Sequence, residues 1–560
     1  NEPYDSAFWQ YFNDIQDVTF ENKLTDEKLD YAATSTSTAQ TEQTKEYEQE
    51  LSIGDHSTYE FTRADKLYGT LTPELACYDV NYYDLTLDID PDEEWIQGTS
   101  AIQFTVVEAT NRIRIDLFEY LKIHSVRFEG ENLAFERDLD AVYVSFPDTL
   151  KIGDTAKILV NYEGHPLDAD FDIWASGFLW QEDNEGHPFA QSLCQGYGAK
   201  GWWPVKNHLS DESDGASVHI TVPESLYAVS NGKLIKTETS VGKSTYYWKV
   251  QHPINNYNVA VHIGNYENAR SEYISQSGNK LTLDYYFLPQ GRELAEKKLQ
   301  MVPKMLEVYE KYFGPYPFSE DGFKIVQSPY PMEHQSCVAV GQYFDEQLIL
   351  HETAHEWWGN SVSVTDNADI WIHEAFATYA ESLYIEETLG YKIGQEYLNA
   401  RKSEILNDHP IVGIEGVNHF HYRIEDKYFK GALMLNTLRR IVGNDTRWFS
   451  LLKSFQTDFR HSSINTDTLL AYFNSSLGKD YTPFFNQYLR TTKIPTLEIR
   501  KSVDGSNYRW GDMIADFNMP INFKEIEISP SGQWQQANFV FTDEDVDQLQ
   551  NKYLIKVEIK

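Results

Sequence analysis

Residues 351–355 read His-Glu-Thr-Ala-His, and a further glutamate, Glu374, follows His355 by 19 residues. On a helix, positions i and i+4 lie on the same face, so His351 and His355 can bind one metal ion. A catalytic zinc site takes three protein ligands and keeps a fourth position open. We therefore predict that His351, His355 and Glu374 bind zinc, and that two packed helices carry the whole site.

The glutamate inside this motif has a different predicted role. Glu352 follows the first histidine directly, which suits it to act on a metal-bound water rather than on the metal. We predict that Glu352 is the general base of a hydrolytic reaction. Glu374 opens a second segment whose apolar residues recur at helical spacing, which predicts an amphipathic helix. These apolar residues are Phe376, Tyr379, Ala380, Leu383 and Tyr384.

Length and charge narrow the class of protein. At 560 residues the chain exceeds one hydrophobic core, so several domains are expected. The formal net charge of −39 argues against binding to nucleic acid or to anionic membrane surfaces. The same charge could attract cationic substrates such as free peptide amino termini, although plain solubility also explains it.

The cysteines, the apolar runs and the first residue concern disulfide bonds, membrane anchoring and export. Cys77, Cys194 and Cys337 are too few and odd in number for a disulfide framework, and at most one pair could form. Since the sequence has no run of 18 apolar residues, we expect no transmembrane anchor. The chain begins with Asn1 rather than Met, so we expect an exported protein, either periplasmic, secreted or at the cell surface. A trimmed cytoplasmic protein would begin in the same way.

The first half of the chain divides into an extension and a β-domain. Residues 1–60 are predicted to be a peripheral extension, because residues 35–44 are polar and low in complexity. Aromatic residues at 9–12 could dock on the body as a small helix. From 61 to 268, apolar residues alternate with polar ones, which predicts an N-terminal β-domain. The alternating residues are Tyr83, Leu85, Leu87 and Ile89; Ile102, Phe104 and Val106; Ile113, Ile115 and Leu117; and Val218, Ile220 and Val222.

The second half changes period twice. Helical spacing predicts a mostly helical catalytic domain over 269–493, beginning with an apolar stripe from Leu294 to Phe313 that ends at Gly314. Short β-like runs at 497–499, 526–528 and 538–541 predict a small C-terminal β-domain over 494–560. The fold class is thus multidomain α+β.

Longer stretches of sequence resemble the zinc aminopeptidase family of aminopeptidase N and leukotriene hydrolase. The resemblance spans about residues 65–560. It rests on His-Glu-Thr-Ala-His-Glu-Trp-Trp-Gly-Asn at 351–360, Trp-Ile-His-Glu-Ala-Phe-Ala at 371–377, Tyr-Pro-Met-Glu-His at 330–334, Tyr-Phe-Lys-Gly-Ala at 428–432, and the β-domain stretches 194–195, 202–208 and 253–257. It implies a β-saddle-like N-terminal domain, a thermolysin-like catalytic domain, a C-terminal β-sandwich-like domain and one zinc ion per chain.

The resemblance also implies roles for residues outside the metal motif. Tyr428 would donate a hydrogen bond to the oxyanion that develops in the transition state. Glu333 would pair with the free α-ammonium group of the substrate, and Gln195 would be its second anchor. Glu356 and Asn360 also match the family, but helix packing or orientation of other groups suffices to explain them.

The sequence departs from the family at several positions. Tyr330 and His334 replace a glycine and an asparagine beside Glu333, which puts the nearby substrate contacts in doubt. Only 67 residues follow Lys493, so we expect the large helical domain of many members to be absent. The cleft would then be more open on that side, or covered by the N-terminal extension or by a second subunit.

We therefore predict a zinc aminopeptidase that hydrolyses the first peptide bond of peptides with free amino termini. A thermolysin-like endopeptidase is one alternative, and it would need no group to bind the amine. A catalytically silent peptide-binding scaffold is another, although such a protein would be expected to have lost a ligand, the base or the tyrosine. Epoxide hydrolysis of the leukotriene type has no support beyond the shared family. The oligomeric state stays open.

Overall fold

Strands dominate the first part of the chain and helices the second, which confirms the predicted α+β fold class. A computed structural model of the protein describes residues 61–169, 176–194, 196–418, 425–503, 505–517, 519–524 and 526–560. The predicted N-terminal extension, with its linker and its aromatic segment, lies outside the described residues, and the predicted domain limits stay predictions.

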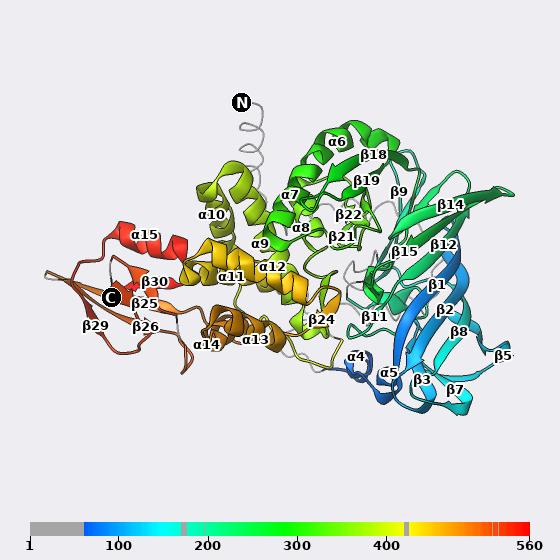
Figure 1. The fold of residues 1–560 in the computed structure, drawn as a ribbon, viewed down its shortest axis with the longest axis horizontal. Coiled ribbons are helices and arrows are strands. Elements are labelled where there is room, and N and C mark those ends of the chain that lie inside the picture. Colours follow the sequence, from blue (N-terminus) through cyan, green and yellow to red (C-terminus); the bar gives the residue numbers. More distant parts are fainter. Residues whose placement is uncertain are drawn as a thin grey trace. The chain divides into compact units, whose positions relative to one another are not determined.

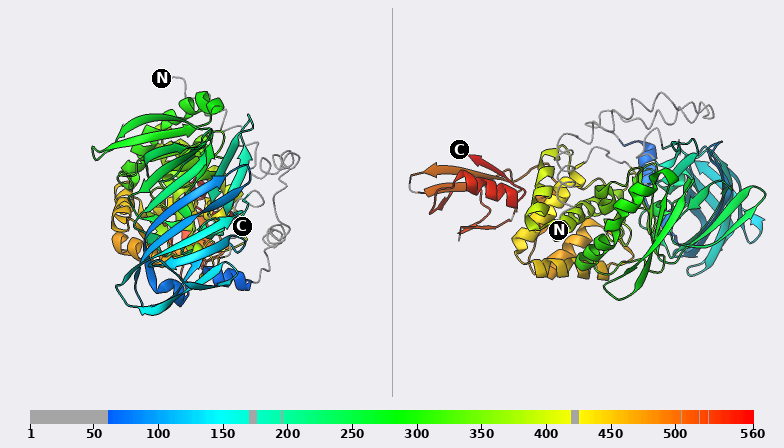
Figure 2. Two further views of the ribbon diagram at one scale, coloured as in Figure 1. Left: turned by 90° about the vertical axis from the view of Figure 1, so that its right-hand side faces the viewer. Right: turned by 90° about the horizontal axis from the view of Figure 1, so that it is seen from above.

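The largest element of the β-rich part is an eight-stranded sheet with the strand order β14-β15-β12-β1-β2-β8-β4-β5 (Figure 1). The left view of Figure 2 looks onto these strands. They are β1 (Tyr78–Asp90), β2 (Trp95–Val106), β4 (Lys122–Phe128), β5 (Glu131–Asn132), β8 (Thr155–Gly164), β12 (Ala216–Pro223), β14 (Lys233–Ser240) and β15 (Lys243–Val250). The predicted alternation holds, because the apolar residues from Tyr83 to Ile89 in β1 are all buried.

Smaller sheets complete this part, in the orders β3-β7-β6, β13-β17-β10-β9 and β11-β16. Their strands are β3 (Thr110–Asp116), β6 (Ala134–Asp138), β7 (Ala141–Leu150), β9 (Gly177–Glu182), β10 (Pro188–Leu193), β11 (Glu212–Ser213), β13 (Tyr227–Val229), β16 (Ile254–Asn255) and β17 (His262–Gly264). Two of these strands end next to residues that are described with the site below: β10 leads directly into Cys194, and β16 is followed by Tyr257.

Two short helices precede β1, where the sequence predicts only strands. They are α4 (Arg63–Gly69) and α5 (Pro73–Ala76). Thr62 and Asp65 form a reciprocal capping box that starts α4, and Pro73 stands at the first position of α5. These capping residues start two helices, although the sequence that follows has the two-residue period of strands.

A group of buried, charged side chains lies in the core of this part of the molecule. Arg114 Nε donates to Asp116 Oδ1 at 2.8 Å, and Lys200 Nζ donates to Asp140 Oδ2 at 2.5 Å. The Lys200 ammonium also lies 3.1 Å from the ring centroid of Tyr197. We call Arg114, Asp116, Asp140 and Lys200 the β-domain cluster. Each of its acids faces a base, as buried charges require.

A five-stranded sheet begins the helical part, in the order β18-β19-β20-β22-β21. Its strands are β18 (Glu267–Ile274), β19 (Lys280–Phe287), β20 (Phe323–Val326), β21 (Pro331–Met332) and β22 (Val338–Val340). Helices α6 (Arg292–Lys298) and α7 (Val302–Phe313) carry most of the predicted apolar stripe, and Gly314 ends α7 with a φ of 99°. Leu294 is an exception, because 36% of its surface is exposed.

The remaining helices of this part include the two that carry the predicted metal ligands. They are α8 (Glu346–Ala354), α9 (Trp371–Leu389), α10 (Tyr391–Ala400), α11 (Phe429–Val442), α12 (Asp445–Asp458), α13 (Thr466–Leu477) and α14 (Thr482–Leu489). Between them, β23 (Val362–Val364) pairs with β24 (Ser462–Ile464). Within the described ranges, no helix combines the length and the apolar character needed to cross a membrane.

The prediction that the helix of Glu374 is amphipathic is wrong. Helix α9 is buried from Trp371 to Leu383 on every side, including its polar residues. One side packs against α11 so closely that a Cβ atom on Gly431 would lie 2.5 Å from the Cβ atom of Ala375. Glycine is therefore required at position 431 for the two helices to meet at this distance.

The C-terminal part combines a four-stranded sheet, β29-β26-β25-β30, with a two-stranded ribbon, β27-β28. Its strands are β25 (Thr496–Ser502), β26 (Gly505–Gly511), β27 (Ile521–Phe523), β28 (Ile526–Ile528), β29 (Gln535–Ala537) and β30 (Lys556–Ile559). The strand expected at 538–541 is wrong, because pairing ends at Ala537. A helix that the sequence analysis missed, α15 (Asp543–Lys552), follows a capping box of Thr542 and Asp545.

Candidate metal centre

Helices α8 and α9 bring the three predicted metal ligands together. His351 lies in the last turn of α8, His355 is the residue that caps this helix, and Glu374 lies in the first turn of α9. The Nε2 atoms of His351 and His355 lie 3.3 and 3.5 Å from Oε2 of Glu374. One ligand atom from each of the three residues lies within 4.8 Å of the others. The spacing predicted from the sequence therefore produces a three-ligand cluster.

The outer nitrogen of each histidine ring has its own partner. Nδ1 of His355 lies 2.9 Å from the backbone oxygen of Trp358, which can only accept a hydrogen bond. This nitrogen must therefore carry the proton, which leaves the lone pair of a neutral ring on Nε2. Nδ1 of His351 lies 2.6 Å from Oε1 of Glu381, a carboxylate that also accepts from the hydroxyl of Tyr397. Both rings thus direct Nε2 toward Glu374.

This arrangement fits zinc. Two imidazole nitrogens and one carboxylate oxygen are the donor set of many catalytic zinc sites, and outer partners of the histidines are their usual support. The charges of the site also favour a cation. Burial alone would lower the pKa of His351, but hydrogen bonds to Glu374 and Glu381 raise it well above its ordinary value.

Two further carboxylates lie beside the ligands. Oxygen atoms of Glu333 and Glu352 and a ring nitrogen of His355 lie within 4.8 Å of one another. Burial raises the pKa of Glu352 to about 8, and the nearby charges of Glu333 and Glu374 add to this shift. Glu333 follows strand β21 and is 2% exposed. A cation between these two carboxylates would bind to both of them.

The residues after the metal motif hold the segment of Glu333 in place. Asn360 Nδ2 donates to the backbone oxygen of Glu333 at 3.0 Å. Glu356 accepts a hydrogen bond from the backbone N–H of Ser336 at 2.7 Å, and Ser336 has the left-handed φ of 55°. Glu356 and Asn360, which the sequence analysis left between orientation and packing, therefore orient the loop that carries Glu333.

Tyr428 and Lys427 contact the other oxygen of Glu374. The hydroxyl of Tyr428, at the start of α11, donates to Oε1 at 3.0 Å. Nζ of Lys427 lies 3.5 Å from the same oxygen, and the lysine side chain is 7% exposed. Burial alone would raise the pKa of Glu374, but Lys427 and the two histidines bring it well below its ordinary value. We call the buried groups around Glu374 the metal-site cluster. Its members are His351, His355, Glu333, Glu352, Glu374, Glu381, Lys427 and Tyr428.

The replaced residues beside Glu333 contact the β-rich part of the molecule. Nδ1 of His334 lies 3.2 Å from Nε2 of His262, and both rings are fully buried. Burial lowers the pKa of His262 to about 3, so the pair is neutral. The backbone N–H of Tyr330 donates to the side chain of Gln191 at 2.9 Å. The departures from the family pattern therefore form contacts with the β-rich part of the molecule.

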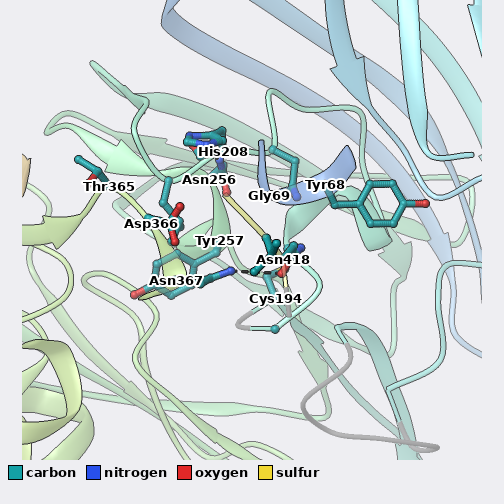
Figure 3. Close-up of a pocket in the computed structure, with 15 residues that line it drawn as sticks. Tyr68, Gly69, Cys194, His208, Asn256, Tyr257, Thr365, Asp366, Asn367 and Asn418 are labelled. Carbon is teal, nitrogen blue, oxygen red and sulfur yellow. Dashed lines mark hydrogen bonds between the residues drawn. The ribbon is translucent and has the colours of Figure 1, made fainter. Parts of the chain in front are cut away.

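A small pocket of about 40 Å³ lies where segments of the β-rich part meet segments of the helical part (Figure 3). Its wall includes Cys194, Asn256, Tyr257, Asp366 and Asn418. Tyr257 connects the pocket to the cluster, since burial and the charges of Glu333 and Glu374 raise the pKa of its phenol well above the ordinary value.

Two other expectations concern residues near this pocket. The predicted amine anchor Gln195 lies outside the described residues. Its neighbour Cys194 and the other two cysteines are free and buried. The Sγ atom of Cys194 accepts a hydrogen bond from Trp202 Nε1 at 3.0 Å, and burial raises the pKa of its thiol to about 12. Cys194 is thus a buried, protonated thiol rather than a nucleophile.

Sequence reasoning missed three members of this region. Glu381 follows Glu374 by seven residues, two helical turns, so its side of the helix could have been read from the spacing. Lys427 precedes α11 in a segment without helical or strand periodicity. Tyr257 is one of 37 tyrosines, and its identity alone carries little information.

The fold and the centre together define a zinc metallopeptidase, a class built on two histidines and a glutamate with a second glutamate beside them. The Peptidase M1 N-terminal domain model matches residues 79–257, and the Peptidase family M1 domain model matches residues 298–488. The chain belongs to peptidase family M1, which confirms the resemblance found in the sequence.

Curated relatives and a solved structure agree with this assignment. Aminopeptidase 2 of Candida albicans is 20% identical over 76% of this chain and 48% of its own length. Leucyl aminopeptidase of Saccharolobus solfataricus is 22% identical over 76% of this chain and 55% of its own length. The chain thus spans about half the length of the curated relatives it matches. The M1 zinc metallopeptidase from Deinococcus radiodurans is 25% identical, with a TM-score of 0.65 over 74% of this chain and 94% of that chain.

Proposed function

We propose that this protein is a zinc aminopeptidase that removes the first residue from peptides with a free amino terminus. The observation that carries this proposal is the position of Glu333, a buried carboxylate within 4.8 Å of both Glu352 and a ring nitrogen of His355. A peptide's α-ammonium group is the cation that can lie between these acids while the first peptide bond faces the metal ligands. Binding of the chain end would fix cleavage at one residue from it.

His351, His355 and Glu374 would hold the zinc ion. When bound, zinc supplies Lewis acidity, which lowers the pKa of a water molecule and polarises a carbonyl group. Glu352 would take one proton from the attacking water as the water oxygen bonds to the carbonyl carbon. It would then pass this proton to the leaving nitrogen as the C–N bond breaks.

Tyr428 would stabilise the charge that develops during this reaction. Its hydroxyl lies 3.0 Å from Glu374 Oε1, beside the metal ligands. A phenol donates its single proton to one acceptor at a time, so it can turn from Glu374 to the carbonyl oxygen as that oxygen gains negative charge. This interaction is made mainly in the transition state and therefore accelerates the reaction.

The pocket beside Tyr257 would contribute polar contacts to a bound peptide. Its walls present amide and carboxylate groups, including the contact from Asn367 Nδ2 to Asn418 Oδ1 at 3.2 Å (Figure 3). Such groups can bind the backbone or a polar side chain of the substrate. A thermolysin-like endopeptidase would have no use for Glu333 at its present position. A silent scaffold would not need Glu352 and Tyr428 together.

The test is hydrolysis of a panel of aminoacyl chromogenic amides, each free and N-acetylated. We expect cleavage of the free forms alone, loss of activity with a zinc chelator and its return with added zinc. A Glu333→Gln variant should lose most activity on free substrates, while an exposed control, Glu296→Gln, should behave as the parent. Equal cleavage of acetylated substrates would contradict the role of Glu333 and favour an endopeptidase. Zinc binding without any cleavage would favour the scaffold.

A further inference from the structure

Lys427 is a buried cation that the proposed reaction does not yet use. It precedes the Tyr428–Gly431 segment on which the family resemblance rests, so the resemblance assigns it nothing. Lys430, the lysine of that segment, points elsewhere, because its Nζ atom donates to the backbone oxygen of Thr491 at 3.0 Å. Lys427 is therefore a separate feature of the metal-site cluster.

The two oxygens of Glu374 face different groups. Oε2 faces the histidines, with Nε2 of His351 at 3.3 Å and Nε2 of His355 at 3.5 Å. Oε1 faces the hydroxyl of Tyr428 at 3.0 Å and the Nζ atom of Lys427 at 3.5 Å. One oxygen is thus directed to the metal, and the other is shared by a neutral donor and a cation.

This sharing matters when the substrate binds. In the proposed reaction Tyr428 turns its single O–H from Glu374 to the carbonyl oxygen, so Oε1 loses that donor. Leaving a buried carboxylate oxygen without a hydrogen bond costs free energy, and this cost would oppose the movement of Tyr428. The Lys427 ammonium has three N–H donors and needs only a small shift to bond the same oxygen. Its positive charge also reduces the attraction of Glu374 for the metal.

We infer that Lys427 is a positioning residue that donates a hydrogen bond to Glu374 Oε1 when Tyr428 turns to the substrate. The same lysine lowers the affinity of the site for zinc and raises the rate of the reaction. The effect on the reaction rate rests on the proposed function, whereas the effect on zinc affinity rests on the geometry of Glu374 alone. Zinc affinity and reaction rate should therefore change in opposite directions when Lys427 is replaced. Removing the cation should strengthen zinc binding and slow the reaction.

The experiment uses the full chain with Lys427→Met. We expect zinc affinity, measured by competition with a chromogenic chelator, to rise about 10-fold, since groups next to metal ligands typically change affinity by 10- to 100-fold. We expect kcat on the preferred free aminoacyl amide to fall about 10- to 100-fold with KM nearly unchanged, because Tyr428 is affected mainly in the transition state. Lys427→Arg, which keeps the charge, should return both quantities toward the parent values.

Lys430→Met is the matched control, since it removes a buried lysine three residues away that points to Thr491. It should leave zinc affinity unchanged. If Lys427→Met does not fold, Lys427→Gln tests the same signs with a polar side chain. Loss of zinc affinity and rate together, or no change in either, would overturn the inference. If the parent protein cleaves nothing, the proposed function fails, while an unchanged or weakened zinc affinity in Lys427→Met would overturn the inferred effect on zinc affinity on its own.

Discussion

The β-domain cluster pairs each of its acids with a base, whereas the metal-site cluster places acids next to one another. In the β-domain cluster, two acids face two bases, and each pair is in direct contact. In the metal-site cluster, the carboxylates of Glu333, Glu352, Glu374 and Glu381 surround two histidines and one lysine. Acids that each contact a base stabilise a fold without any ligand, whereas buried acids next to one another indicate that a cation belongs to the working state. The pairing of the acids therefore distinguishes the two clusters.

Glu352→Gln should produce the largest effect and test this comparison directly. We expect kcat to fall by about 10³-fold, within the range for loss of a general base. Zinc content should stay the same, and the melting temperature should not fall, because one of several crowded acids has been neutralised. Kinetics, metal analysis and thermal melting measure the three quantities. A large drop in melting temperature would show that these adjacent acids hold the fold, and the comparison would then be broken.

Arg114→Met should show the opposite behaviour in the β-domain cluster. Because it leaves Asp116 buried without its base, we expect the free energy of unfolding to fall by about 3–5 kcal/mol. Zinc content and kcat of the folded protein should stay near the parent values. Urea unfolding measures the change. Arg112→Met is the control, since Arg112 lies on the same strand in an exposed ion pair with Glu136 and should cost below about 1 kcal/mol.

Glu381→Gln sharpens the comparison within the metal-site cluster. Glu381 supports the ring of His351 through a contact of 2.6 Å, so its neutralisation should lower zinc affinity by about 10- to 100-fold. Glu386→Gln on the same helix should not, since Glu386 pairs with Arg439 at 2.8 Å away from the ligands. Chelator competition measures both variants. Equal zinc affinity in the two variants would mean that ring orientation does not depend on Glu381.

Glu212→Gln should have the smallest effect and concerns a partly buried acid outside both clusters. Burial raises the pKa of Glu212 to about 7, and its Oε1 atom accepts from Ser463 at 3.2 Å. A folded-state pKa above the unfolded value of about 4.5 gives stability that is complete below pH 4.5 and lost as pH rises toward 7.

The Glu212→Gln variant should therefore be more stable than the parent at pH 8, by about 1–2 kcal/mol, and nearly equal at pH 4.5. Melting temperatures at the two pH values check this, with the exposed Glu224→Gln as control. A stability difference independent of pH would show that Glu212 is ionised in the native protein.

The grouping of His351, His355 and Glu374 could be predicted from the sequence because their positions obey helical geometry. His351 and His355 are one turn apart, and the apolar spacing after Glu374 marks its helix. The exposed face expected for α9 was wrong for a physical reason: the polar residues Thr378 and Glu381 are buried rather than exposed to water. Hydropathy alone cannot distinguish these two situations.

The rest of the site depends on contacts between segments far apart in the chain. Lys427 and Glu374 are 53 positions apart, and the loop before α11 has no periodic pattern that fixes its path. Tyr257 enters from the β-rich part of the molecule. In the C-terminal part, the aromatic run at 538–541 has the composition of a strand. Phe539 and Phe541 pack against each other instead, with ring centroids 4.8 Å apart.

The close approach of Gly431 to Ala375 has a consequence for motion. Because only the Ala375 methyl group separates the two helices at this point, we expect α9 and α11 to keep their relative position. Glu374 and Tyr428 lie near this contact, on the first turn of α9 and at the start of α11. The movement that brings Tyr428 to a substrate is then expected to be a rotation of the tyrosine side chain rather than a domain closure.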